Sequence, residues 1–375
     1  MEYEFRIKAT NTLLILGNGF DLNCHLDSKF SDYFKEKKTQ IVNNISDFSV
    51  NKICDNIWDL LLYFAFYDEQ LETRRLFKKH NENEILWMDV ESFIKSVILG
   101  NITTDKWLEK AQRAKYLSYI SIIQDAYTDR ARFVLGDTTQ MNLLKQFFSL
   151  KKIDKSIDIY TFLYEELLDF GEQFKKFIKD QLTDNDAYLF NAKTLLRQLV
   201  EPEETFSIIT FNYTMPLAKN LDEKLHCNIH GTINDRIIIG YDSSDQNDNE
   251  TKGIRLSKSW QKMNSDSHRY KLPSKNEIKK IKIYGHSLGP QDYAYFHAIF
   301  DYYDIYDGDV VLYFCYTPYK ACEEENNDIR DGFVSSVYKL LNDYAFKSGK
   351  ESKVHTIVTK LQIENRIKIK PVPKI

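Results

Sequence analysis

The sequence predicts an α/β fold, in which a Rossmann-like, mostly parallel sheet is interrupted by a large all-helical insertion. Short apolar runs alternate with helical stretches near both ends of the chain, a pattern typical of a parallel sheet covered by helices. Between residues 51 and 204, apolar residues recur at helical spacing and glycine is rare. Because the apolar run at 12–16 has no candidate partner before 206–211, we expect one nucleotide-binding domain of residues 1–50 and 205–375, interrupted by the insertion at 51–204.

The individual elements follow from the spacing of apolar residues. A strand at 12–16 leads into the glycine turn and a helix at 30–38. We expect helices within the insertion at 51–71, 86–99, 106–127, 156–182 and 186–200, before the stop at Glu201-Pro-Glu-Glu204. Strands are then expected at 206–211, 227–230, 236–240, 281–284, 310–314 and 354–358, with helices at 215–225, 291–303 and 332–346.

Composition excludes several classes of protein. The 375 residues are 43% hydrophobic and 14% aromatic, as in globular proteins, and the net charge of −4 gives no strong nucleic-acid signal. We expect the basic runs at 271–282 and beyond 350 to be solvated. Five cysteines without a Cys-x-x-Cys pair favour a reducing compartment and no metal. The apolar runs are too short for a membrane span and the first residues are polar, so we expect a cytoplasmic protein.

The turn Gly17-Asn18-Gly19-Phe20-Asp21 stands between the first strand and a helix start. Glycines at this place let the backbone approach a phosphate, and a helix start offers unpaired N–H groups. The match to a dinucleotide fingerprint is partial, because Leu22 stands where a third glycine belongs. The alternative is a structural turn in which Asp21 caps the next helix.

Polar residues also follow the later strands, and carboxyl ends of parallel strands meet at one edge of a sheet. They are Asn212-Tyr213-Thr214, His230-Gly231, and Gly285-His286-Ser287-Leu288-Gly289-Pro290-Gln291-Asp292. Structural alternatives exist for each: Asn212 or Thr214 capping a helix opened by Pro216, a strand-end role for His230, and a first-turn position for Asp292. We expect Gly19 and His230 to share one site.

Gly285-x-Ser287-x-Gly289 also has the spacing of the nucleophile elbow of serine hydrolases. Triad partners would come from Asp301, Asp304, Asp307 or Asp309 and from His355. The strands that precede this motif are too few for a contiguous hydrolase sheet, and His355 falls in an expected strand. These two features favour the nucleotide-binding interpretation, with a serine hydrolase as the alternative.

Within the insertion, Trp87-Met-Asp89-Val-Glu91 opens a helix with an apolar stripe at 90, 93, 94, 97 and 98. Asp89 and Glu91 border the two sides of this stripe. Such carboxylates either cap a helix start, as favoured for Asp89, or reach across an interface.

Taken together, these stretches resemble the AbiH family of bacteriophage abortive-infection proteins. The resemblance rests on Gly17 to Leu22 with Ser28, Phe30 and Asp32, Trp87 to Glu91, Thr210-Phe-Asn212-Tyr-Thr, Ile229-His230-Gly231, and Tyr284 to Gly289 followed by Asp292. It implies an antiviral role in phage resistance. One departure is His25, where the family usually has a glycine and positive φ is costly for histidine.

The same order of elements is similar to sirtuin-like (SIR2-type) NAD-consuming defence domains. This likeness implies Asn212 and His230 as catalytic residues and a nucleotide, NAD, as ligand or substrate. The implied binding residues are Gly17, Asn18, Gly19, Phe20, Asp21, Tyr213, Gly231, Gly285, His286, Ser287 and Asp292, with Trp87, Asp89 and Glu91 as contacts from the insertion. We expect NAD hydrolysis, with a non-catalytic nucleotide sensor as a further alternative. A homo-oligomer is compatible with the sequence, which does not name the phage trigger.

Overall fold

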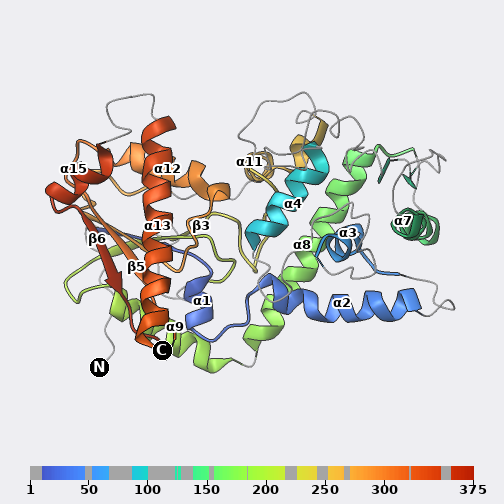
Figure 1. The fold of residues 1–375 in the computed structure, drawn as a ribbon, viewed down its shortest axis with the longest axis horizontal. Coiled ribbons are helices and arrows are strands. Elements are labelled where there is room, and N and C mark those ends of the chain that lie inside the picture. Colours follow the sequence, from blue (N-terminus) through green and yellow to red (C-terminus); the bar gives the residue numbers. More distant parts are fainter. Residues whose placement is uncertain are drawn as a thin grey trace. The chain divides into compact units, whose positions relative to one another are not determined.

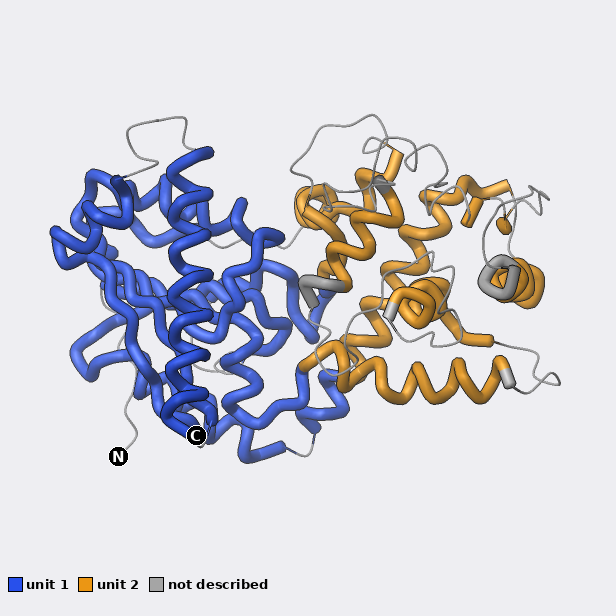
Figure 2. The backbone as a smooth tube through the Cα atoms, viewed as in Figure 1, with its two compact units in different colours: residues 1–28, 178–237, 266–375 blue, residues 29–177, 238–265 orange. Residues whose placement is uncertain are grey.

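The computed structural model of the chain describes residues 11–46, 53–66, 87–99, 123–124, 126–127, 138–151, 156–183, 185–215, 226–242, 252–265, 271–320, 322–347 and 356–375 (Figure 1). The chain divides into two compact units (Figure 2). The α/β unit consists of residues 1–28, 178–237 and 266–375, and the helical unit of residues 29–177 and 238–265. The helical unit thus takes up a second, later segment of the chain in addition to the region near the predicted insertion.

The α/β unit is built on one sheet of six parallel strands. In sequence order these are β1 (Thr12–Leu16), β2 (Phe206–Thr210), β3 (His226–Asn228), β4 (Lys280–Tyr284), β5 (Val311–Tyr316) and β6 (Ile367–Pro371). Their order across the sheet is β3-β2-β1-β4-β5-β6, which is the strand order of dinucleotide-binding Rossmann domains. Leu14 pairs directly with Ile208, so the strands on either side of the helical region are neighbours. The predicted fold class is confirmed.

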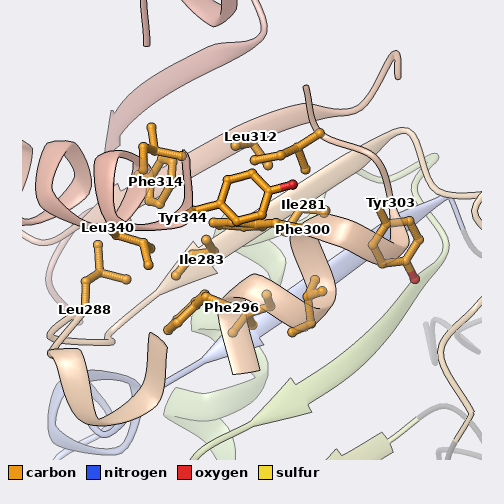
Figure 3. Close-up of a cluster of buried hydrophobic side chains, with 14 of the residues drawn as sticks. Ile281, Ile283, Leu288, Phe296, Phe300, Tyr303, Leu312, Phe314, Leu340 and Tyr344 are labelled. Carbon is orange, nitrogen blue, oxygen red and sulfur yellow. The ribbon is translucent and has the colours of Figure 1, made fainter. Parts of the chain in front are cut away.

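Helices and a hydrophobic core complete the α/β unit. The helices are α1 (Gly19–Asn23), α9 (Asp186–Leu199), α12 (Tyr293–Tyr302), α13 (Glu323–Lys347) and α15 (Ile357–Ile363), with a short 3₁₀ helix η3 (Pro290–Asp292) before α12. Figure 3 shows Ile281 and Ile283 of β4 close to Phe296 and Phe300 of α12, and all four side chains are fully buried. This packing places α12 against β4, the strand that leads into the loop at 285–292.

Two predicted strands are wrong. Residues 236–240 form no strand, although Ile237 makes an isolated bridge to Gly231. In the described part of 354–358, Ile357 already begins α15. The last strand is instead β6, whose residues are half-buried or exposed. Its alternating isoleucines and lysines fit the outermost strand of the sheet, a pattern that the sequence analysis attributed to a solvated basic tail.

The basic run at 271–282 is likewise not a uniformly solvated face. Lys282 lies on β4 and is 6% exposed, and its Nζ donates to Glu204 Oε2 at 2.6 Å and to the Leu199 carbonyl at 2.8 Å. Lys280 Nζ donates to Glu201 Oε2 at 2.9 Å. Glu201 and Glu204, which precede β2, neutralise the charges of these two lysines. These ion pairs therefore join β4 to the segment before β2.

The helical unit contains α2 (Phe30–Ser46), α3 (Ile57–Phe66), α4 (Trp87–Leu99), α7 (Thr138–Leu150), most of α8 (Ile159–Thr183), a 3₁₀ helix η2 (Ile254–Leu256) and α11 (Lys258–Met263). Aromatic packing joins α2 to α8, with the Tyr33 ring 5.7 Å from Phe170 and 5.3 Å from Phe174. This packing explains why α2 belongs to the helical unit. The helix predicted at 106–127 and the one at 215–225 lie largely outside the described residues.

No helix among the described residues is long and apolar enough to cross a membrane.

One buried carboxyl should make the stability of the helical unit depend on pH. Asp59 is fully buried in α3, and burial raises its pKa to about 6 against the opposing effect of Lys37, 3.6 Å away. Because the folded pKa lies above the unfolded value near 3.8, the contribution of Asp59 is fully present below pH 3.8 and is lost as the pH rises through about 6. The total loss is about 3 kcal/mol.

We therefore expect wild-type protein to lose about 1 to 2 kcal/mol more unfolding free energy between pH 5 and pH 8 than an Asp59→Asn variant. Tryptophan fluorescence during urea unfolding can measure this difference, because all four tryptophans lie in the ranges of the helical unit. Parallel pH dependences for the two proteins would contradict the prediction, whatever the absolute stability of the variant.

Candidate functional site

The candidate site lies at the carboxyl edge of four neighbouring strands. In the order β3, β2, β1 and β4, these strands lead into His230, Asn212, the turn at 17–21, and the loop at 285–292. The order of connections reverses between β1 and β4, which is where ligands bind in open parallel sheets. The topology therefore brings the predicted residues of the α/β unit to one edge.

At the reversal point, the loops after β1 and β4 touch through glycines. The Gly17 N–H donates to the Tyr284 carbonyl at 2.9 Å, and the Gly19 N–H donates to the Gly285 carbonyl at 2.7 Å. A Cβ on Gly17 would lie 2.6 Å from His286 Cα, and one on Gly19 would lie 2.8 Å from Gly285 Cα. The close approach of the two loops explains why glycine occupies both positions, without the need for a bound anion.

Asp21 does not cap its helix, which corrects the structural alternative considered for it. Its buried carboxylate accepts from Tyr188 Oη at 2.7 Å, from Thr214 Oγ1 at 2.9 and 3.0 Å, and from the side chain of Asn212. Burial raises the pKa of Asp21 to about 6, while these donors oppose the shift. Asp21 thus joins α1 and α9 to the loop after β2.

Asn212 is hydrogen-bonded through its backbone N–H, its carbonyl and its side-chain NH₂, while its side-chain oxygen is buried. Its backbone N–H donates to Thr210 Oγ1 at 3.0 Å, and its carbonyl accepts from Asn228 Nδ2 at 2.8 Å. The bond to Asp21 uses the amide NH₂, because a carboxylate only accepts. The residue is 5% exposed, and within the described structure its Oδ1 has no hydrogen-bond partner. An unsatisfied buried acceptor costs about 1 to 3 kcal/mol, and a hydrogen-bond donor on a bound molecule would remove this cost.

Asp292 lies between two buried histidines. Its Oδ2 is 3.3 Å from His286 Nε2, and its Oδ1 is 3.7 Å from His230 Nε2. His286 Nδ1 accepts the backbone N–H of Leu288 at 2.9 Å. A neutral His286 therefore carries its proton on Nε2, which faces the carboxylate.

An aromatic wall backs the two histidines. The Phe211 ring lies 4.3 Å from His286 and 5.5 Å from His230, and it stacks on Phe296 at 5.6 Å. Tyr295 lies 5.8 Å from His230. His230 and His286 are buried beside these rings, at 5% and 7% exposure, and charges interact more strongly in such surroundings than in water.

The loops after β2 and β3 support each other. Gly231 has φ +79°, and a Cβ there would lie 2.0 Å from the Arg236 carbonyl oxygen. The Tyr213 carbonyl accepts the Ile233 N–H at 2.9 Å. The described contacts of Tyr213 and Gly231 thus shape the loop around His230.

The loop after β4 does not have the geometry of a nucleophile elbow. Ser287 is exposed, but positive φ occurs at Gly285 and Leu288, at 70° and 55°, and not at the serine. The next element is the 3₁₀ helix η3, whereas an elbow leads directly into an α-helix. His355 lies outside the described residues. The geometry therefore disfavours the serine hydrolase alternative.

The residues named in the insertion lie on α4 of the helical unit. The helix begins at Trp87, so Asp89 is in its first turn, and the side chains of both lie outside the described structure. Glu91 Oε1 is 2.6 Å from Lys258 Nζ, and both side chains are buried. The described role of Glu91 is thus an ion pair between α4 and α11.

His25 adopts the backbone conformation that favours glycine, with φ +62°. It follows α1, where the His25 N–H donates to the Leu22 carbonyl at 3.1 Å and the Leu26 N–H to the Asp21 carbonyl at 3.0 Å. This is a Schellman motif with histidine at the left-handed position. Histidine in place of the family's usual glycine therefore does not disrupt this turn.

Sequence reasoning missed Tyr188 and Tyr295 as members of this region. Tyr188 lies on the buried side of a predicted helix, and nothing in the spacing shows that its hydroxyl reaches Asp21. Tyr295 follows Asp292 by three residues, so only that spacing could have indicated it.

The fold and the residues at the carboxyl edge of the sheet define an α/β protein with Rossmann strand order and a polar site built from asparagine, histidine and aspartate. The chain belongs to the AbiH family: the family model described as bacteriophage abortive infection AbiH matches residues 13–314. Comparisons with curated proteins and with solved structures give no match. The family resemblance is confirmed, and it supports a role in phage abortive infection.

Proposed function

We propose that this abortive-infection protein binds NAD or a related nucleotide at the carboxyl edge of its sheet and hydrolyses it. The observation that carries the proposal is Asn212 Oδ1, a buried acceptor whose amide is oriented by Asp21. It lies one strand away from the loop that holds His230. A nucleotide has hydroxyl and amide donors that fit such an acceptor, and the strand order is one that binds dinucleotides.

The proposed reaction breaks the bond between ribose C1′ and the nicotinamide nitrogen and joins C1′ to the oxygen of water. Nicotinamide leaves with the bonding electron pair, and water gives up one proton. Asn212 orients the ribose or the water through its free oxygen, and His230 accepts the proton. Neither the turn at 17–21 nor the loop at 285–292 takes part in proton transfer in this scheme.

The test is calorimetric titration of NAD together with measurement of NAD loss. His230→Ala should retain NAD affinity and lose about 10²- to 10⁴-fold in turnover, because a proton-transfer step is removed. Asn212→Ala should weaken binding by about 1 to 3 kcal/mol. Asn234→Ala, an exposed asparagine of the same unit, is the matched control.

Unchanged affinity in a folded Asn212→Ala protein, or full turnover in His230→Ala, would remove the support for this assignment. Binding of NAD without any loss of NAD in wild type would favour the non-catalytic sensor. Labelling by a fluorophosphonate that disappears in Ser287→Ala would instead establish a serine nucleophile. Gly19 is unsuited as a probe of binding, because any side chain there strikes Gly285.

A further inference from the structure

Asp292 is placed to act on both histidines of the edge at once. Its two carboxylate oxygens face different rings, Oδ2 at 3.3 Å from His286 Nε2 and Oδ1 at 3.7 Å from His230 Nε2. The residue stands at the N-terminal boundary of α12, yet its side chain makes no capping hydrogen bond to that helix. The expected first-turn role therefore does not explain the orientation of the carboxylate.

We infer that Asp292 is a positioning residue: its carboxylate, 3.7 Å from His230 Nε2, orients His230 through its charge and stabilises the protonated form of that ring, while His286 holds the carboxylate in place. The inference rests on the proposed function, in which His230 accepts a proton. His286 can hold the carboxylate because its Nδ1 already accepts from Leu288, which places the proton of a neutral ring on Nε2, the atom 3.3 Å from Asp292 Oδ2. A residue that orients an imidazole and stabilises the imidazolium has the role of aspartate in a catalytic triad.

Asp292 supplies a negative charge close to the ring of His230. Among the titratable groups, Asp292 of η3 and Tyr295 of α12 have described contacts with His230, His286 of the loop after β4 contacts Asp292, and Asp21 of α1 contacts Asn212. Phe211 contributes only an aromatic face. A carboxylate within about 4 to 6 Å of an imidazole favours the protonated form of that imidazole.

The first measurement needs no nucleotide. The pKa of His230 can be followed by the NMR signals of the histidine Cε1–H groups, with His230→Gln used to assign its resonance. Asp292→Asn should lower the pKa of His230 by about one unit or more, and Asp292→Glu should restore part of the shift. Asp301→Asn is the control, since the Asp301 carboxylate lies on α12, accepts from Tyr344 Oη of α13 and has no described contact with His230.

The second measurement is NAD turnover as a function of pH. Asp292→Asn should lower kcat at least tenfold with KM nearly unchanged, and it should move the acid limb of the pH profile to lower pH. An unchanged pKa of His230 in folded Asp292→Asn, or an unchanged kcat, overturns the inference. If wild type consumes no NAD, the proposed function fails, and the NMR titration still decides whether Asp292 controls His230.

Discussion

Lys258→Met should lower the free energy of unfolding of the helical unit by about 3 to 5 kcal/mol. Lys258 Nζ lies 2.6 Å from Glu91 Oε1, and the two side chains are 1% and 9% exposed. Removing the ammonium leaves the Glu91 carboxylate buried without this countercharge, and the desolvation of a lone buried charge is costly. Urea unfolding followed by tryptophan fluorescence reports on this unit, because residues 58, 87, 107 and 260 all lie in it.

A double variant separates the ion pair from simple packing. Lys258→Met combined with Glu91→Met should recover most of the lost stability, because replacing both members of a buried pair by apolar residues is often nearly neutral. The control is Lys175→Met, which removes a lysine paired with the largely exposed Glu172 and should cost less than about 1 kcal/mol. Equal losses in the single and double variants would show that Lys258 acts through packing alone.

The sequence was sufficient for the fold class because the relevant signal is local. Five of the six strands overlap apolar runs that spacing alone identifies, and the helical block has a clear period. The edge of the sheet could also be predicted, since carboxyl ends of parallel strands must meet. The pairing of Leu14 with Ile208 followed from the lack of any earlier partner strand.

Features that depend on one long-range contact could not be predicted. The segment 238–265 joins the helical unit, yet the sequence analysis assigned its start to a strand, since Ile237, Ile238 and Ile239 are apolar and β-branched. Their burial satisfies the same hydrophobic pattern without strand pairing. Similarly, a lysine-rich run suggests a solvated surface unless the position of Glu204 is known.

The role of the glycines in the turn at 17–21 also could not be predicted from the sequence. A Gly-x-Gly turn before a helix favours a phosphate site, because glycine allows close approach of an anion. It equally allows close approach of another backbone, and the loop after β4 approaches here. The local sequence does not show whether glycine is needed for the approach of an anion or for the approach of another backbone. The structure allows these two explanations to be tested separately.

Gly285→Ala should therefore destabilise the α/β unit by at least about 3 kcal/mol. Gly285 has φ +70°, and a Cβ would lie 2.4 Å from the Phe20 backbone nitrogen and 2.8 Å from the Gly19 carbonyl carbon. Both neighbours are backbone atoms of the turn after β1, so neither can move without disturbing that turn. Hydrogen exchange measured on peptides of β1 and β4 should show protection reduced by about 100-fold or more.

Gly332→Ala is the matched control for the same substitution in the same unit. Gly332 is an exposed residue of α13, and a Cβ there has nothing within 4 Å. Alanine should stabilise this helix by about 0.5 to 1 kcal/mol, because it restricts the unfolded chain and favours the helical conformation. If Gly285→Ala were tolerated as well as Gly332→Ala, the contact between the loops after β1 and β4 would not be what requires glycine at 285, and a ligand that approaches this backbone would become the better explanation.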